Sequence, residues 1–72
     1  MRVFHIAIEK EDDWLIAHGL EERGIVTQGR TLDEIHENVR EVIALMFDEH
    51  DVQLELILPP SMQPKADVAK AG

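Results

Sequence analysis

The chain has 72 residues and no cysteine, and its 15 acidic against 7 basic side chains give a formal net charge of −8. This length allows a single domain, and a chain without cysteine has neither disulfides nor thiolate metal sites to stabilise it. Because the basic residues are scattered, the charge disfavours direct contact with a nucleic acid. It favours a basic protein partner, and it also suits a chain that is acidic for solubility alone.

The small size predicts self-association, because a short domain buries a limited share of its surface and must gain stability from packing or assembly. We expect a homodimer or homotetramer. The apolar runs are too short to span a bilayer, and the amino terminus starts with a β-prone segment in place of a signal peptide. The expected location is cytoplasmic, without membrane contact.

Two strands are predicted at the start of the chain. Residues 2–9, RVFHIAIE, and residues 14–20, WLIAHGL, contain the alternation of apolar side chains that is typical of half-buried strands. A charged three-residue loop at 10–12 would pair Ile8 with Trp14 and place the large apolar residues on a common face. We therefore predict this hairpin register.

A short third strand, IVTQ at 25–28, is followed by a turn and then by a helix predicted over 32–48. Thr31 is the expected N-cap, and Glu34, three residues later, completes a capping box. Leu45 falls outside the apolar stripe of this helix and is a candidate for an oligomer contact. The predicted stripe that faces the core consists of Leu32, Ile35, Val39, Val42, Ile43, Met46 and Phe47.

The fourth predicted strand is VQLELIL at 52–58, and two prolines end it. The domain therefore covers residues 1–58, and residues 59–72 are predicted to be a flexible tail. The order β-β-β-α-β predicts an α+β fold with one helix covering one face of a four-stranded sheet. The opposite face is expected to expose Val3, Ala7, Leu15, Ala17 and Ile57.

No catalytic or metal-binding pattern is recognisable. The segment GIVTQGRTLDEI has too few glycines for a phosphate loop. The only serine, Ser61, is paired with no base by any motif. The four histidines lack helical metal-ligand spacing: the predicted register places His5 and His18 on opposite faces, and His36 is expected to be partly buried. We therefore expect no enzyme, no metal and no cofactor.

A charged hairpin with an aromatic, a short strand ending in TQG, and a helix opening with TLDEI together resemble the HicB-like antitoxins. The resemblance covers residues 1 to about 58, with Trp14 at the family's aromatic position. The matching positions are Gly24, Thr27, Gln28, Gly29, Thr31, Leu32, Asp33, Glu34, Asn38 and Glu41. The segment LEERGI lacks the proline and cysteine that the family often has before its third strand, which leaves the shape of that connection open.

This resemblance implies a fold similar to a truncated RNase H, with strand order 3-2-1-4. It also implies that the protein binds and neutralises a small basic HicA-like mRNA endonuclease, whose catalytic histidine belongs to the toxin. Only fourteen residues follow Leu58, so we expect a short, single-domain member without the DNA-binding extension of many relatives. The alternative is a stand-alone oligomeric domain with a regulatory or small-molecule-binding role and no toxin partner.

Two groups of residues follow from this interpretation. An acidic inhibitor of a basic protein is expected to use the acids of its turns and the neighbouring aromatic. The expected partner-binding residues are Glu11, Asp12, Asp13, Trp14, Glu21 and Glu22. The expected structural motif at the junction of strand and helix is Thr27, Gln28, Gly29, Thr31 and Glu34.

Overall fold

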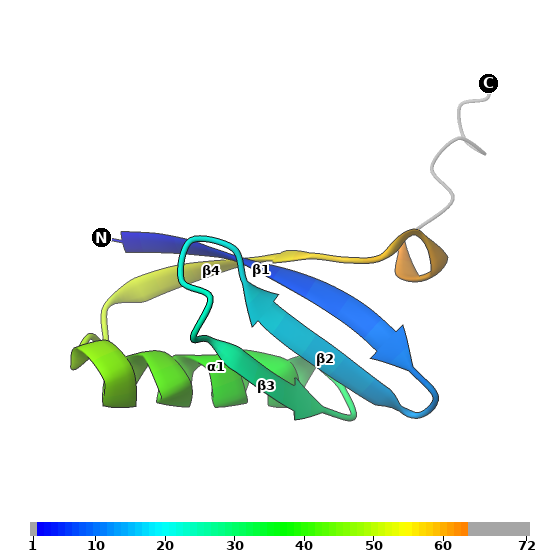
Figure 1. Cartoon of the computed structure of the whole chain (residues 1–72), viewed down its shortest axis with the longest axis horizontal. Helices are drawn as coiled ribbons and strands as arrows, with labels where there is room; N and C mark the ends of the chain where they lie inside the picture. The colour runs from blue at the N-terminus through cyan, green and yellow to red at the C-terminus, as the bar shows by residue number, and fades with distance from the viewer. Residues whose placement is uncertain (1, 64–72) are drawn as a thin grey trace, which may run out of the picture.

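The computed structural model describes residues 2–63, which form four strands, one α-helix and one short 3-10 helix (Figure 1). The elements in chain order are β1 (Arg2–Glu11), β2 (Trp14–Gly19), β3 (Val26–Gly29), α1 (Leu32–Phe47), β4 (Val52–Ile57) and η1 (Pro60–Met62).

The strands form one mixed sheet in the order β3-β2-β1-β4. The pairs β1–β2 and β2–β3 are antiparallel, and β4 lies parallel to β1 at the edge. The helix α1 covers one face of the sheet, closest to β3 and β2 (Figure 1). The predicted α+β fold, its strand order and the single helix on one face are thus confirmed.

The core lies between α1 and the sheet. Its fully buried large side chains come from the first strand, the helix and the loop before β3. They are Phe4, Ile6, Ile25, Ile35, Val39 and Ile43. The alternation of β1 and the stripe of α1 therefore do face each other, as their periods predict.

The predicted register of the first hairpin is wrong. Glu11 pairs with Trp14, so the turn contains only Asp12 and Asp13. Asp12 adopts the left-handed conformation with φ 55°, which aspartate tolerates better than most residues and which such tight turns need. Ile8 pairs with Ala17 and not with Trp14, so the pairing is shifted by three residues from the predicted one. A shift by an odd number of residues exchanges the side chains on the two faces of a strand.

The corrected register changes which residues the uncovered side of the sheet exposes. Leu15 and Ala17, expected on that side, are buried in the core. Ile16 and His18 take their place, and His18 lies directly opposite Ala7 of β1. We call this side the open sheet face; its apolar and histidine residues are Val3, His5, Ala7, Trp14, Ile16, His18, Val26 and Ile57.

The helix ends one residue before the predicted position, because Asp48 leaves the helical conformation with φ 57° and its N–H bonds to the carbonyl of Ala44. Leu45 is 82% exposed, outside the apolar stripe as predicted. Met46, which was expected in the stripe, is also exposed. Its methyl group lies beside Gly24, 3.0 Å from where a Cβ at that position would be.

The chain continues beyond the predicted domain boundary at residue 58. Pro60–Met62 form the 3-10 helix η1, and Met62 packs against the core cluster. The packed part of the domain therefore includes the first residues of the predicted flexible tail, and residues 64–72 of that tail lie outside the described residues.

Candidate functional site

The junction between β3 and α1 is built by hydrogen bonds within a few residues. The hydroxyl of Thr31 accepts a hydrogen bond from the Glu34 N–H at 3.1 Å. In return, the Glu34 carboxylate accepts one from the Arg30 N–H at 2.8 Å. These are the reciprocal contacts of a capping box, shifted by one residue on the carboxylate side. Thr31 and Glu34 therefore start the helix.

Two further residues of this junction fix the helix against β3. A side chain at Gly29 would bring its Cβ to 3.1 Å from the Cβ of Glu34, so the close approach favours glycine. The Asn38 amide donates a hydrogen bond to the carbonyl of Gln28 at 2.9 Å, and Thr27 lies half-buried on β3. The segment TQG thus supports the fold through its backbone.

The Thr31→Ala variant is expected to lose about 1 kcal/mol of unfolding free energy, because it removes the acceptor for a first-turn N–H. Thr31→Ser retains the hydroxyl and is expected to recover most of the loss. Urea unfolding of the three proteins measures both effects. Equal unfolding midpoints for the alanine variant and the parent protein would show that the cap contributes nothing.

One predicted group of acids surrounds an exposed aromatic at the β1–β2 hairpin. Trp14 is 37% exposed, and the guanidinium of Arg30 lies over its ring at 4.7 Å from the centroid. We call this the hairpin surface; it consists of Glu11, Asp12, Asp13, Trp14 and Arg30. Tryptophan and arginine carry a large share of the binding energy in protein interfaces, commonly inside a rim of weaker polar contacts. The hairpin surface has this composition.

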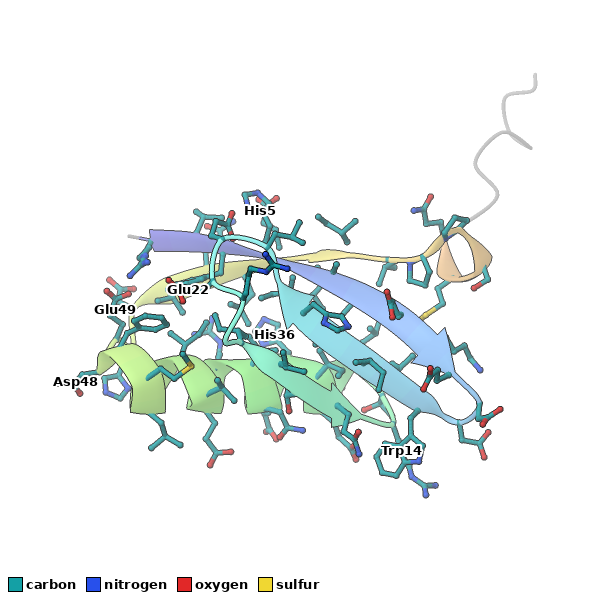
Figure 2. The ribbon with its side chains drawn as sticks, viewed as in Figure 1. His5, Trp14, Glu22, His36, Asp48 and Glu49 are labelled. Atoms are coloured by element: carbon teal, nitrogen blue, oxygen red, sulfur yellow. The ribbon has the colours of Figure 1, made fainter. Side chains whose placement is uncertain are left out.

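The other two predicted partner-binding acids lie elsewhere. Figure 2 shows Trp14 beside the hairpin and Glu22 at the opposite end of β2. The six residues of β2 separate the two groups by roughly 20 Å at the usual rise of a strand. The structure therefore brings together Glu11, Asp12, Asp13 and Trp14 and leaves Glu21 and Glu22 out of that cluster.

Glu21 instead completes the sheet where β2 has ended. Its carboxylate accepts a hydrogen bond from the His5 N–H at 2.9 Å and also contacts Nδ1 of the His5 ring. The His5 carbonyl accepts the N–H of Leu20 at 2.9 Å. Glu22 contributes its carbonyl, which accepts the N–H of Ile25 at 3.1 Å. The loop between β2 and β3 is thus closed by Glu21 and Glu22, two of the five acids that were predicted to bind a partner.

The contact with Glu21 shifts the acid–base equilibria of both partners. The hydrogen bond with the Glu21 carboxylate raises the pKa of His5 above its ordinary value of 6.5. The His5 backbone N–H, followed by the ring, lowers the pKa of Glu21 below its ordinary value of 4.5. On the far side, Nε2 of His5 lies 3.8 Å from Glu55. The imidazole is therefore held between two carboxylates on the open sheet face.

These shifts predict a pH window. Because the pKa of His5 is raised, its contribution to stability is complete below pH 6.5 and is lost as the pH rises through the raised pKa. Because the pKa of Glu21 is lowered, its contribution is present above pH 4.5 and is lost as the pH falls through the lowered pKa. The contact stabilises the fold most between these two values.

The difference in urea midpoint between the parent protein and Glu21→Gln is therefore expected to be largest from pH 4.5 to pH 6.5 and to shrink on both sides. Glu22→Gln, which changes the neighbouring acid, is the matched control and is expected to give no such maximum. A difference for Glu21→Gln that stays constant from acid to alkaline pH would contradict the assignment.

Two shallow hollows lie on the surface of the described residues. A hollow of about 480 Å³ is lined by His18, Gly19, Leu20 and Arg23, and another of about 300 Å³ by Arg2, Glu49, His50 and Asp51.

Within residues 2–63, no three histidine or carboxylate side chains lie close enough together to bind a metal ion. The same residues contain no helix that is long and apolar enough to cross a membrane.

Comparisons with protein-family models, with curated proteins and with solved structures found no match for this chain. Two surfaces of the described residues could bind a partner: the hairpin surface and the open sheet face. The first combines negative charge with an aromatic anchor, and the second combines exposed apolar side chains with histidine–glutamate contacts.

Proposed function

We propose that the protein is a HicB-like antitoxin that binds and neutralises a small basic HicA-like mRNA endonuclease. The pattern from Gly24 to Glu41, which resembles that family, supports the proposal, and the strand order 3-2-1-4 agrees with what the resemblance implies. The observation that carries it is the hairpin surface, where three acids flank Trp14 and its stacked arginine.

Opposite charges would attract the two proteins of such a complex. An endonuclease that takes RNA needs basic side chains for the phosphates. A chain with a net charge of −8 attracts that basic surface and accelerates the encounter. The acids at the hairpin then occupy the positions that RNA phosphates would take, while Trp14 supplies apolar contact area.

In this proposal the chain is a binding protein and the catalytic residues belong to its partner. It needs no metal or cofactor, and it contacts no nucleic acid itself, since its acids repel the phosphate backbone. It acts in the cytoplasm, where mRNA is the target of the toxin. The hydrogen bonds at the β3–α1 junction hold the scaffold rather than a ligand.

Co-expression tests the proposal. A reading frame next to the gene that encodes a small basic protein with a candidate catalytic histidine is expected to arrest growth when expressed alone. Expression of the present chain together with it is expected to restore growth. The same toxin with its histidine replaced by alanine controls for arrest that does not come from RNA cleavage. Arrest that persists with both proteins present would exclude the antitoxin role.

A further inference from the structure

The sheet ends in two edge strands, β3 and β4, which differ in how well they are protected. β3 is four residues long, and its Gln28 carbonyl accepts the side-chain amide of Asn38 from α1 at 2.9 Å. β4 is six residues long, contains no lysine or proline, and lies at the other edge beside β1 (Figure 1). Short length, lysine, proline and covering elements are the features that normally prevent an edge from pairing with another chain. Among the described residues, no strand pairs with the outer side of β4.

The hydrogen bonds of β1 show which backbone groups of β4 point outwards. The N–H of His5 bonds to the Glu21 carboxylate, on the β2 side of the strand. Successive residues of a strand direct their backbone groups to opposite sides, so Ile6 directs its N–H and carbonyl towards β4. Ile6 is paired with Leu56, and in a parallel ladder it bonds to the two residues that flank Leu56. The N–H and carbonyl of Leu56 itself therefore point outwards, and so do those of Leu54, two residues earlier.

The side chains along this edge are apolar on one face of the sheet and acidic on the other. Leu54, Leu56 and Leu58 pack against the core but are only half-buried, because α1 lies closest to β3 and β2. On the opposite face, Glu55 exposes 53% of its side chain, and the exposed Asp51 precedes the strand. A strand added at this edge covers the leucines with one set of its side chains and meets negative charge with the other.

We propose that the outer edge of β4 binds an extended segment of another protein, in which apolar and basic residues alternate. The outward N–H and carbonyl groups of Leu54 and Leu56 bond to the backbone of that segment, as in other cases of strand addition. Its apolar residues lie beside the half-buried leucines, and its basic residues lie beside Glu55. A second copy of the chain is a poorer occupant, because its own β4 brings another glutamate to the same edge.

The proposal goes beyond the antitoxin role, because it concerns a surface other than the hairpin surface and does not require the partner to be an endonuclease. Amide hydrogen exchange of the full 72-residue chain first tests whether the edge is open. The N–H groups of Leu54 and Leu56 are expected to exchange at least about tenfold faster than that of Glu55, which points to β1. Equal protection of the three would show that the edge is already covered and would overturn the inference.

The binding probe is a synthetic peptide of about eight residues, the length of an ordinary strand, in which lysine and valine alternate. At saturation it is expected to slow the exchange of Leu54 and Leu56 by about tenfold and to leave Gln28, at the other edge, unchanged. The same peptide with methylated backbone nitrogens retains its side chains and charges but cannot donate to the edge. It is expected to bind at least about tenfold more weakly. Unchanged exchange with the first peptide, or equal binding of both peptides, would overturn the inference.

Charge reversal tests the place of the basic residues. Glu55→Lys is expected to weaken binding of the lysine–valine peptide about fivefold, because attraction between neighbouring strands becomes repulsion. A peptide in which glutamate and valine alternate is expected to bind this variant better than it binds the parent protein. The matched control is Glu41→Lys, the same change at an exposed position of α1, with an expected effect below about twofold. Circular dichroism checks that both variants fold, and equal weakening by the two would overturn the pairing at β4.

Discussion

Replacement of Gly19 by alanine is expected to destabilise the protein by about 3 kcal/mol, the upper range for overpacking. The added Cβ would lie 2.6 Å from the carbonyl oxygen of Glu22 and 2.9 Å from the Cβ of Ile25. Neither atom can move freely: that carbonyl accepts the Ile25 N–H, and Ile25 is fully buried. A domain of this size has roughly 4 to 10 kcal/mol of stability in all, so the loss is a large fraction.

Gly24→Ala is the matched control for this prediction. Its added Cβ would meet only the methyl end of the Met46 side chain, at 3.0 Å. That flexible side chain is exposed and can move aside, so the loss is expected to stay below about 1 kcal/mol. Urea unfolding of both variants gives the comparison. Similar losses at the two positions would show that the loop does not close tightly over Gly19.

Neutralising the three acids of the hairpin surface is expected to slow association with the proposed toxin by about tenfold at low salt, because steering depends on the local charge. The variant combines Glu11→Gln, Asp12→Asn and Asp13→Asn. Asparagine at position 12 retains the left-handed conformation that the turn requires. Trp14→Ala is expected to weaken the complex by about thirtyfold through faster dissociation, the effect of losing a central anchor.

The control removes the same number of charges away from the hairpin, through Glu37→Gln, Glu41→Gln and Asp51→Asn, all at exposed positions. Its association rate is expected to change by less than about threefold. Association and dissociation rates, measured at low and high salt with the toxin immobilised on a sensor surface, distinguish the hairpin variant from the control variant. Equal slowing by both would mean that only the total charge matters, and an unchanged complex with Trp14→Ala would place the contact elsewhere.

The register of the first hairpin shows where sequence patterns stop being informative. Alternation correctly identifies β1 and β2 as strands, but it does not decide which side of β2 faces inward. The prediction buried the larger residues, Trp14 and Ile16. The fold buries Leu15, Ala17 and Gly19, because the following loop returns over Gly19 and Ile25 fills the adjacent core. That path depends on contacts made after β2 has ended.

The candidate site also contains contacts that the sequence predicts and contacts that it does not. The cap at Thr31 was predictable, because its hydrogen bond spans three residues and has a known sequence pattern. The contact between His5 and Glu21 spans sixteen residues and exists only where β2 ends short of His5. No spacing in the sequence marks it. The separation of the hairpin acids from Glu21 and Glu22, by contrast, could have been estimated from the length of the intervening strand.

The most direct test of the antitoxin role is RNA cleavage by the purified proposed toxin, a small basic endonuclease, with increasing amounts of the present chain. Cleavage is expected to stop near an equimolar ratio, and the chain alone with Mg²⁺ or Mn²⁺ is expected to leave RNA and RNA–DNA hybrids intact. Cleavage that continues in the presence of a large excess of the chain would contradict the proposed function. So would metal-dependent cleavage by the chain itself that disappears when its own acids are replaced.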